Sequence, residues 1–154
     1  MPLLNVFDIS GSAMAAQTVR LNTTASNIAN AQSVAENPED TYRARHPVFA
    51  AQLASHMQSG QVQGGSQQAF AGETWGTPNS GVHIQGIVES EAPLQMRYEP
   101  EHPHANEDGY VAYPNVSVVE EMANMISASR SFQLNVEVLN TAKTLAERVL
   151  SLGQ

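Results

Sequence analysis

The chain contains no cysteine among its 154 residues, so disulfides, thiolate metal ligands and cysteine nucleophiles are all excluded. It also has few charges: Asp, Glu, Lys and Arg make up 14% of the residues, below the roughly 25% of ordinary globular chains. Acids outnumber bases by 15 to 7, and a formal net charge of −8 argues against partners such as nucleic acid or anionic lipid. The sparse charge leaves much uncharged surface, which favours contact with other subunits.

Long hydrophobic runs are missing as well. The opening residues, MPLLNVFD, lack the basic and apolar regions of a secretory signal, and no apolar run approaches the length of a membrane span. We therefore expect no direct membrane insertion. If the chain ends up outside the cytoplasm, we expect an export route that does not read a cleaved signal peptide.

The usual signatures of catalysis are absent too: the sequence has no phosphate-binding glycine loop, dinucleotide fingerprint or nucleophile elbow. His102 and His104 lie among acids, but two histidines around Pro103 lack the spacing of structural zinc sites, so a solvated acidic loop is favoured. A metal-dependent hydrolase built on them is the least favoured class. We predict no catalytic residues, no cofactor, no metal and no small-molecule substrate.

What the chain does have is an apolar repeat with steps of three and four at each end. Such steps place each repeat on one stripe of a helix, and narrow stripes with small residues suit helices that pack on other helices. The first repeat comprises Phe7, Gly11, Met14, Thr18, Leu21, Ala25 and Ile28. The second comprises Val118, Met122, Met125, Ser129, Phe132, Val136, Leu139, Lys143, Ala146 and Leu150.

The first repeat predicts a helix from about Ile9 to Asn30, capped by Asp8 or Ser10 and about 33 Å long. Between Asp8 and Glu36 the only charged side chain is Arg20. A helix in solvent is normally charged on its outer face, so we expect burial of this helix on several sides.

The second repeat predicts a helix of roughly 50 Å that ends near Leu152, before Gly153. Its start carries a capping box, in which Ser117 is followed three residues later by Glu120. The middle of the chain is too small to cover so long a helix. We expect it to pair with the first helix, with other subunits, or with both.

Between the helices the sequence predicts two further parts. Residues 33–80 form a loop-rich segment with many Gln and Gly, a turn at residues 37–40, and a short strand or helical turn near Pro47. Within this segment Trp75 is either a packing anchor or an interface residue.

Residues 81–114 form a small β-rich part. The strands 81–90, with a bulge at Gly86, and 94–98 are expected to pair as a hairpin, followed by a solvated loop at 99–109. The predicted fold is α+β, with residues 1–32 and 115–154 as a terminal helical assembly domain.

Two motifs resemble those of the bacterial flagellar rod and hook proteins. Residues 25–30, Ala-Ser-Asn-Ile-Ala-Asn, match the family's N-terminal core Ala-x-Asn-Ile-Ala-Asn. The stretch 109–143, from Gly-Tyr-Val-Ala-Tyr-Pro-Asn-Val to Asn-Thr-Ala-Lys, is similar to the ending of proximal-rod subunits of that family. The resemblance covers about residues 1–32 and 81–154.

The resemblance implies a structural subunit whose terminal helices form the inner layer of a helical tube with a small β-rich part outside. It implies location in the basal-body rod in the periplasm and departure through the flagellar export apparatus. The implied partners are further copies of the chain, other rod proteins, the membrane ring and export components.

From the two helices and this resemblance we predict head-to-tail association that does not close on itself, the contact that builds helical filaments. Burial is assigned to Met14, Leu21, Ala25, Ile28, Met122, Met125, Phe132, Val136 and Leu139. Register is assigned to the amides of Asn27, Asn30, Asn115, Asn135 and Asn140. Arg130 either pairs with an acid of a neighbouring subunit or stays solvated. The alternative is a closed coiled-coil adaptor, which predicts charged flanks that the first helix lacks.

Overall fold

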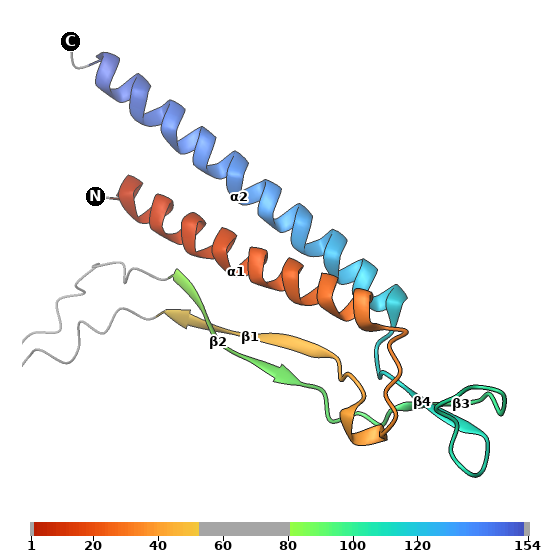
Figure 1. Ribbon diagram of the computed structural model, residues 1–154. Coiled ribbons are helices and arrows are strands. Elements are labelled where there is room, and N and C mark those ends of the chain that lie inside the picture. The colour runs from red at the N-terminus through yellow and green to blue at the C-terminus, as the bar shows by residue number, and fades with distance from the viewer. Residues whose placement is uncertain (1, 53–80, 153–154) are drawn as a thin grey trace, which may run out of the picture.

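The computed structural model describes residues 2–52 and 81–152 of the chain. It contains two long helices and two small antiparallel sheets, which confirms the predicted α+β class (Figure 1). In chain order the elements are α1 (Pro2–Asn30), a 3-10 turn η1 (Pro38–Asp40), β1 (Arg45–Gln52), β2 (Gly81–Glu89), β3 (Gln95–Tyr98), β4 (Tyr110–Tyr113) and α2 (Val118–Leu152).

The two helices lie side by side and run in opposite directions, so both chain ends are found at the same end of the molecule (Figure 1). The β1–β2 ribbon lies along the side of α1 that faces away from α2, and β3 and β4 lie at the opposite end from the termini. The guanidinium of Arg20 donates to Asn124 Oδ1 at 2.9 Å and so ties α1 to α2. Helix α1 is therefore covered on two sides, as its low charge predicted.

The start of α1 differs from the prediction, because the helix begins at Pro2 and not at Ile9. Asp8 is an exposed residue inside the helix and Ser10 is buried, so neither is its cap. Proline is well tolerated in a first helical turn, where its missing N–H would have no partner anyway. A helix that begins with proline needs no capping side chain at Asp8 or Ser10, so its true start lies earlier than predicted.

Helix α2 follows the prediction at both ends: it begins directly after Ser117 and runs to Leu152. The amide of Glu121 donates to the carbonyl of Ser117 at 2.9 Å, which closes the first turn. Gly153, the predicted stop, lies outside the described residues. None of the helices in the described ranges 2–52 and 81–152 is both long and apolar enough to cross a membrane.

The predicted pairing of the strands was wrong. Strand β2 pairs with β1, from Arg45 opposite Glu89 to Gln52 opposite Gly81, and β3 pairs with β4. The segment between β2 and β3 does not form a hairpin turn. It is held instead by Asn115, whose side-chain Nδ2 donates to the carbonyls of Ser90 (3.3 Å) and Ala92 (2.8 Å).

Other features of the middle region agree with the sequence. The region near Pro47 is a strand, β1, which lies inside the segment 33–80. The bulge expected at Gly86 is present, since Val48 faces Gly86 while Phe49 faces Ile84. The turn at residues 37–40 contains η1. Trp75, His56 and most of the Gln- and Gly-rich segment lie outside the described residues.

The interior is thin and made of small side chains. Its buried apolar residues are Ala16, Ala44, Val111, Ala112, Val116, Ala128 and Ala142, and its buried polar residues are Ser10, Thr23, Thr24, Asn27, Thr41 and Glu121. Small residues let the two helix backbones approach closely, but they bury little apolar area per residue. Many large side chains are consequently left on the surface of the subunit.

Candidate assembly interface

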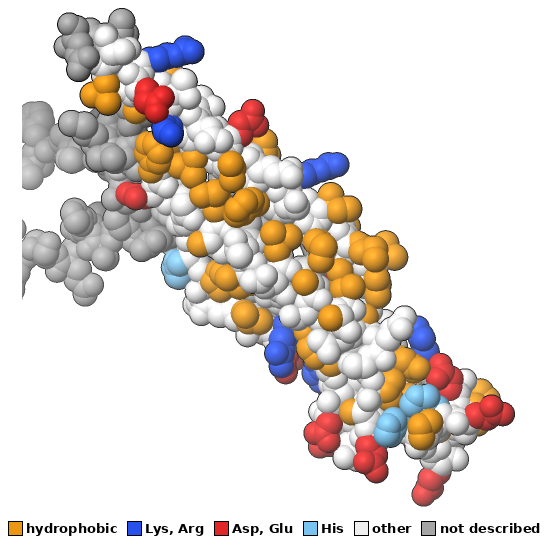
Figure 2. All heavy atoms as spheres, turned by 45° about the horizontal axis from the view of Figure 1, so that its top comes forward, with side chains coloured by type: hydrophobic (Ala, Val, Ile, Leu, Met, Phe, Trp, Pro, Cys, Tyr) orange, Lys and Arg blue, Asp and Glu red, His pale blue; other side chains and the backbone are white. Residues whose placement is uncertain are grey.

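Apart from Leu150 near its end, the exposed large apolar side chains of α2 form two groups along the helix. We call Val119, Met122 and Ile126 the proximal patch and Leu134, Val138, Leu145 and Val149 the distal patch; between 46% and 78% of each residue is exposed. Figure 2 shows hydrophobic side chains gathered along the helices, whereas acids and histidines gather at the end that holds β3 and β4. Exposed apolar surface of this extent is typical of a protein–protein contact site.

Both patches lie beside the predicted stripe of α2 and not on it, apart from Met122. The predicted residues Met125, Phe132, Val136 and Leu139 are half-buried, near the fully buried Ala128 that packs in the interior. Met122 was predicted, and the patch residues follow steps of four, from 122 to 126 and from 134 to 138, and again from 145 to 149. Counting such steps would have revealed a second apolar stripe in the sequence.

A shallow groove accompanies the distal patch. A hollow of about 410 Å³ is lined by Val6 of α1 and, on α2, by Leu134, Glu137, Val138, Thr141, Ala142 and Leu145. A further hollow of about 310 Å³ adjoins it and is lined by residues of α2 alone, Arg148 among them. We call the first hollow and the distal patch together the distal groove.

The exposed side of α1 has a different character, because its side chains are small and uncharged. We call it the α1 outer face; its exposed residues are Ala15, Thr18, Asn22, Ala25, Ser26 and Ala29. At Gly11, which continues this face, a Cβ would meet nothing within 4 Å. Asp8 lies at the N-terminal end of the face and is its one charged residue.

The structure distributes the predicted residues of α1 over different surroundings. Met14, Leu21 and Ile28 are half-buried, whereas Ala25 is exposed on the α1 outer face. Asn30 donates from Nδ2 to the carbonyl of Ser26 at 2.8 Å, within its own helix. The apolar residues predicted for burial are thus only partly buried within the subunit.

The predicted polar residues of α2 also lie near the surface. Asn135 is half-buried and donates to the carbonyl of Ser131 at 2.8 Å, while Asn140 is exposed. Arg130 is exposed between the two patches, and within residues 2–52 and 81–152 its guanidinium has no hydrogen bond or ion pair. Its positive charge is therefore free for an acid outside this part of the chain.

Asn27 lies inside the subunit, where it joins the end of α1 to the start of β1. The residue is completely buried. Its Nδ2 donates to the Arg45 carbonyl at 2.8 Å, and its Oδ1 accepts from the Arg45 amide at 3.0 Å and from the Tyr42 hydroxyl at 2.8 Å. The side chain thus makes three hydrogen bonds within its own chain.

Asn115 performs the same task from the segment between β4 and α2. Its Oδ1 accepts from the Ala44 amide at 2.8 Å, next to the residue that Asn27 holds, and the amide of Ser90 donates to the Ala44 carbonyl at 2.7 Å. Residues 44 and 45, where β1 begins, are thereby held by one side chain near the end of α1 and by one in the segment that leads into α2. We call this polar meeting point the junction.

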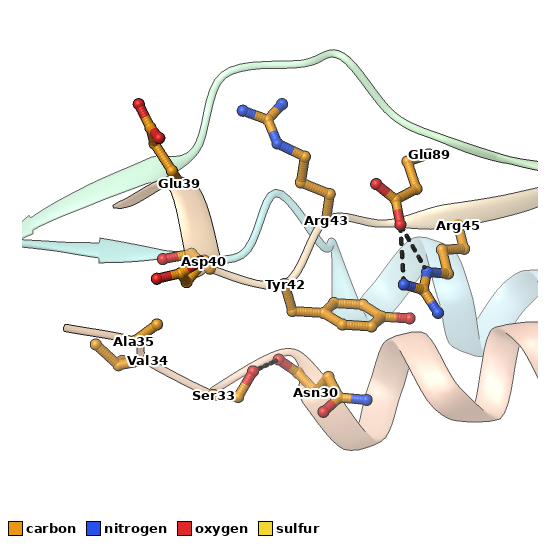
Figure 3. Close-up of a pocket in the computed structure, with 11 residues that line it drawn as sticks. Asn30, Ser33, Val34, Ala35, Glu39, Asp40, Tyr42, Arg43, Arg45 and Glu89 are labelled. Carbon is orange, nitrogen blue, oxygen red and sulfur yellow. Dashed lines mark hydrogen bonds and ion pairs between the residues drawn. The ribbon is translucent and has the colours of Figure 1, made fainter. Parts of the chain in front are cut away.

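Beside the junction lies a hollow of about 540 Å³ lined mainly by polar and charged residues (Figure 3). The Arg45 guanidinium donates to Glu89 Oε1 at 2.9 and 3.1 Å, while the Arg43 side chain extends away from α1. Burial raises the pKa of Tyr42 above its ordinary value of 10.0, and the nearby Arg45 opposes part of that rise. The hollow pairs opposite charges, but it does not set a nucleophile against a base.

No metal centre is found in the described parts of the chain, since no three His, Asp or Glu side chains there come together in a suitable cluster. The rings of His102 and His104 lie 5.5 Å apart in the loop between β3 and β4. The candidate contact surfaces on the helices are the two patches and the α1 outer face; on the strands, Ile87, Val88, Met96 and Tyr98 are exposed as well.

Two family profiles match the two ends of the chain. The profile described as "Flagella basal body rod protein" matches residues 7–34, and "Flagellar basal body rod FlgEFG protein C-terminal" matches residues 107–152. These matches cover most of α1, β4 and all of α2, and so include the two patches and the α1 outer face.

Relatives match over their full length. The chain is 47% identical to the flagellar basal-body rod protein FlgC of Salmonella typhimurium (strain LT2), and the alignment covers 100% of both chains. It is 46% identical to FlgC of Escherichia coli O157:H7, again over 100% of both. FlgC of Borreliella burgdorferi is 29% identical, over 100% of this chain and 99% of that protein.

Proposed function

The chain belongs to the family of the flagellar basal-body rod protein FlgC, and from this membership we propose how the subunit is built into the rod. It is a structural subunit of the bacterial flagellar basal-body rod, and it assembles with other rod proteins. We propose that it has no catalytic activity and that residues 1–32 and 115–154 form its assembly domain, with the strands placed outside the helical layer.

The observation that carries this proposal is the amount of large apolar surface left open on α2. Seven side chains of the two patches are about half exposed or more. At about 25 cal/mol per Å² of apolar surface, covering side chains of this size stabilises a contact by roughly 1–2 kcal/mol each. Repeated along a helix of 35 residues, such burial supports extended helix-to-helix contact between subunits.

For the predicted interface residues we propose divided roles. Met122, with the rest of the proximal patch, supplies burial between subunits, as do the half-buried Leu21, Ile28 and Phe132 at the edges of the helix pair. Arg130 pairs with an acid of a neighbouring subunit. Asn27 and Asn115 act within the subunit, because their hydrogen-bonding groups are already occupied there.

We further propose that the subunit resides in the periplasmic part of the rod, reached through the flagellum's own export apparatus. Its contacts with the membrane ring and with export components are proposals of the same kind. The support for this location is the family membership. The net charge of −8 argues separately against nucleic acid or anionic lipid as partners.

The proposal is tested by replacing one exposed apolar residue of α2 with an acid. Ile126→Asp, at a residue that is 56% exposed, is expected to leave the free subunit folded and to prevent its incorporation into basal bodies. The reason is that a carboxylate has to lose its water in a helix-to-helix contact, at a cost of several kcal/mol. Incorporation is measured by immunoblotting of purified basal bodies, and motility is scored on soft agar.

The matched control is Met96→Asp, on strand β3, where the side chain is 53% exposed. It introduces the same charge at equal exposure but away from the helices, and we expect normal incorporation. Equal incorporation of the two variants would contradict assembly through the helices. A lower thermal stability of Ile126→Asp than of Met96→Asp would show that the substitution acts on folding instead.

A further inference from the structure

The distal groove and the α1 outer face differ in a way that makes them complementary. The groove presents large side chains, such as Leu134, Val138 and Leu145, around a hollow of about 410 Å³. The α1 outer face presents side chains no larger than asparagine. We propose that the distal groove of one copy receives the α1 outer face of a second copy, a contact that rests on the proposed rod function.

The two surfaces lie on opposite flanks of the subunit. Val6, which lines the groove, and Ala15, which lies on the outer face, are nine residues apart in α1. At about 100° per residue this spacing places them on opposite sides of the helix. A copy bound at one flank leaves its own other flank open for the next, so the contact is heterologous and continues without closing.

The surfaces also match in length and in step. The α1 outer face extends from Gly11 to Ala29, about 27 Å, and the distal patch extends from Leu134 to Val149, about 22 Å. In a tube whose copies all point the same way, α1 of one copy runs antiparallel to α2 of its neighbour. Full overlap then sets Ala15 opposite Leu145.

The rest of the register follows from the spacing of the residues. Moving along both helices in steps of three and four keeps the same alignment, in which Gly11 lies opposite Val149, Asn22 opposite Val138 and Ser26 opposite Leu134. A small residue thus faces a large one at each level, as in knobs-into-holes packing.

Charge favours the same arrangement. The α1 outer face has no charge to desolvate except Asp8 at its N-terminal end. In the register above, Asp8 of the second copy comes within about one helical turn of Arg148, an exposed base at the end of α2. A pairing of two distal grooves would instead set large side chains against large ones and would close a dimer.

Because the chain contains no cysteine, engineered disulfides report this contact directly. Two single variants, Ala15→Cys and Leu145→Cys, are produced together in a flagellated host that lacks its own copy of the subunit. Basal bodies are then oxidised and analysed by non-reducing electrophoresis and mass spectrometry. We expect most of the two variants to be joined as a heterodimer, and the same for Asn22→Cys with Val138→Cys.

The mismatched pair Ala15→Cys with Leu134→Cys is the control, since its positions are displaced by about 16 Å along the helix. Cross-linking of this pair as strongly as the matched pairs, homodimers of Leu145→Cys alone, or no cross-link in basal bodies that contain both variants would each overturn the proposal. The rod assignment would survive all three. Absence of the unsubstituted chain from basal bodies would contradict the proposed function itself.

A bulky substitution covers the case in which the cysteine variants are not incorporated. Ala15→Trp fills the outer face of α1 without touching the interior, so we expect a folded subunit that is lost from basal bodies. Glu101→Trp, in the exposed loop between β3 and β4, is the control and should be incorporated. Incorporation of Ala15→Trp at the level of this control would overturn the proposal.

Discussion

The junction and the outer surface of α2 differ in the polarity of their side chains. At the junction, polar side chains are buried and each is hydrogen-bonded within the chain, with Asn27 at the centre. On the outer surfaces, large apolar side chains of α2 are about half exposed or more. The polar contacts of the junction are therefore made within the subunit, whereas the apolar surface of α2 is left incompletely covered.

This difference separates two kinds of stability. Hydrogen bonds at the junction set the position of the β1–β2 ribbon against the helices before any neighbour arrives. An unmet buried polar group costs about 1–3 kcal/mol, so this part tolerates little change. An exposed apolar residue costs the free subunit little, and its contribution appears only on assembly.

The largest effect on the free subunit is expected for Asn27→Ala. The substitution leaves the Arg45 amide, the Arg45 carbonyl and the Tyr42 hydroxyl without their partner. We expect the free energy of unfolding to fall by about 3–5 kcal/mol, since three groups lose their hydrogen bond to a completely buried side chain. Urea denaturation followed by circular dichroism measures this change.

The matched control is Asn22→Ala, an asparagine on the exposed side of the same helix. Its removal is expected to change the free energy of unfolding by no more than about 0.5 kcal/mol, as for most surface substitutions. Similar values for the two variants would remove the distinction between a closed junction and an open helix surface.

A smaller effect is expected at Gly109, in the turn before β4. Its φ angle is +81°, and a Cβ there would come within 2.9 Å of Tyr98 Cε2. Gly109→Ala is expected to cost about 1–3 kcal/mol, because a side chain is strained at positive φ and the ring has to move. The change should appear as faster amide hydrogen exchange in β3 and β4.

Gly86→Ala is the comparison for this variant, because a Cβ at Gly86 meets nothing within 4 Å and its φ is not positive. We expect amide exchange in β1 and β2 to stay the same within error. If both variants loosened their strands equally, the local geometry of Gly109 would not be the cause.

The sequence predicted the helices well and the strands poorly, for physical reasons. Repeats of three and four determine a helix locally, so both helices were found and the limits of α2 were correct. Alternation identifies a strand but not its partner: β2 pairs with β1, which precedes it by about thirty residues. The pairing depends on Asn115, whose hydrogen bonds to Ser90 and Ala92 no local pattern reveals.

The sequence predicted the candidate interface only in part. Apolar periodicity predicted that α2 meets another helix, and the predicted residues turned out to be half-buried near α1. A periodic stripe does not show whether a helix packs on its own chain or on a neighbour. Asn27 illustrates this limit, because it was predicted to fix the register between subunits and is hydrogen-bonded within its own chain. A second stripe, which includes the distal patch, can be counted in the sequence, but only the burial of the first stripe shows that the second is the exposed one.

The smallest effect is expected for Tyr42→Phe, which removes one of the three hydrogen bonds of Asn27. The Arg45 amide still donates to the same Oδ1, so we expect a loss of about 1 kcal/mol at neutral pH. Burial raises the pKa of Tyr42 in the folded chain above its ordinary value of 10.0. The stability that this tyrosine contributes is therefore complete below pH 10 and is lost as the pH rises through its folded-state pKa.

Alkaline denaturation of the parent chain and of Tyr42→Phe tests the sign of this dependence. The hydrogen bond from Tyr113 to Glu99 also raises the pKa of Tyr113, but this contribution is common to both proteins and cancels in their difference. The stability difference between parent and variant should shrink once the pH exceeds 10, since an ionised Tyr42 can no longer donate to Asn27. A difference that stays constant up to the alkaline limit would contradict the raised pKa of Tyr42, and no difference at neutral pH would mean that its hydroxyl contributes nothing to the junction.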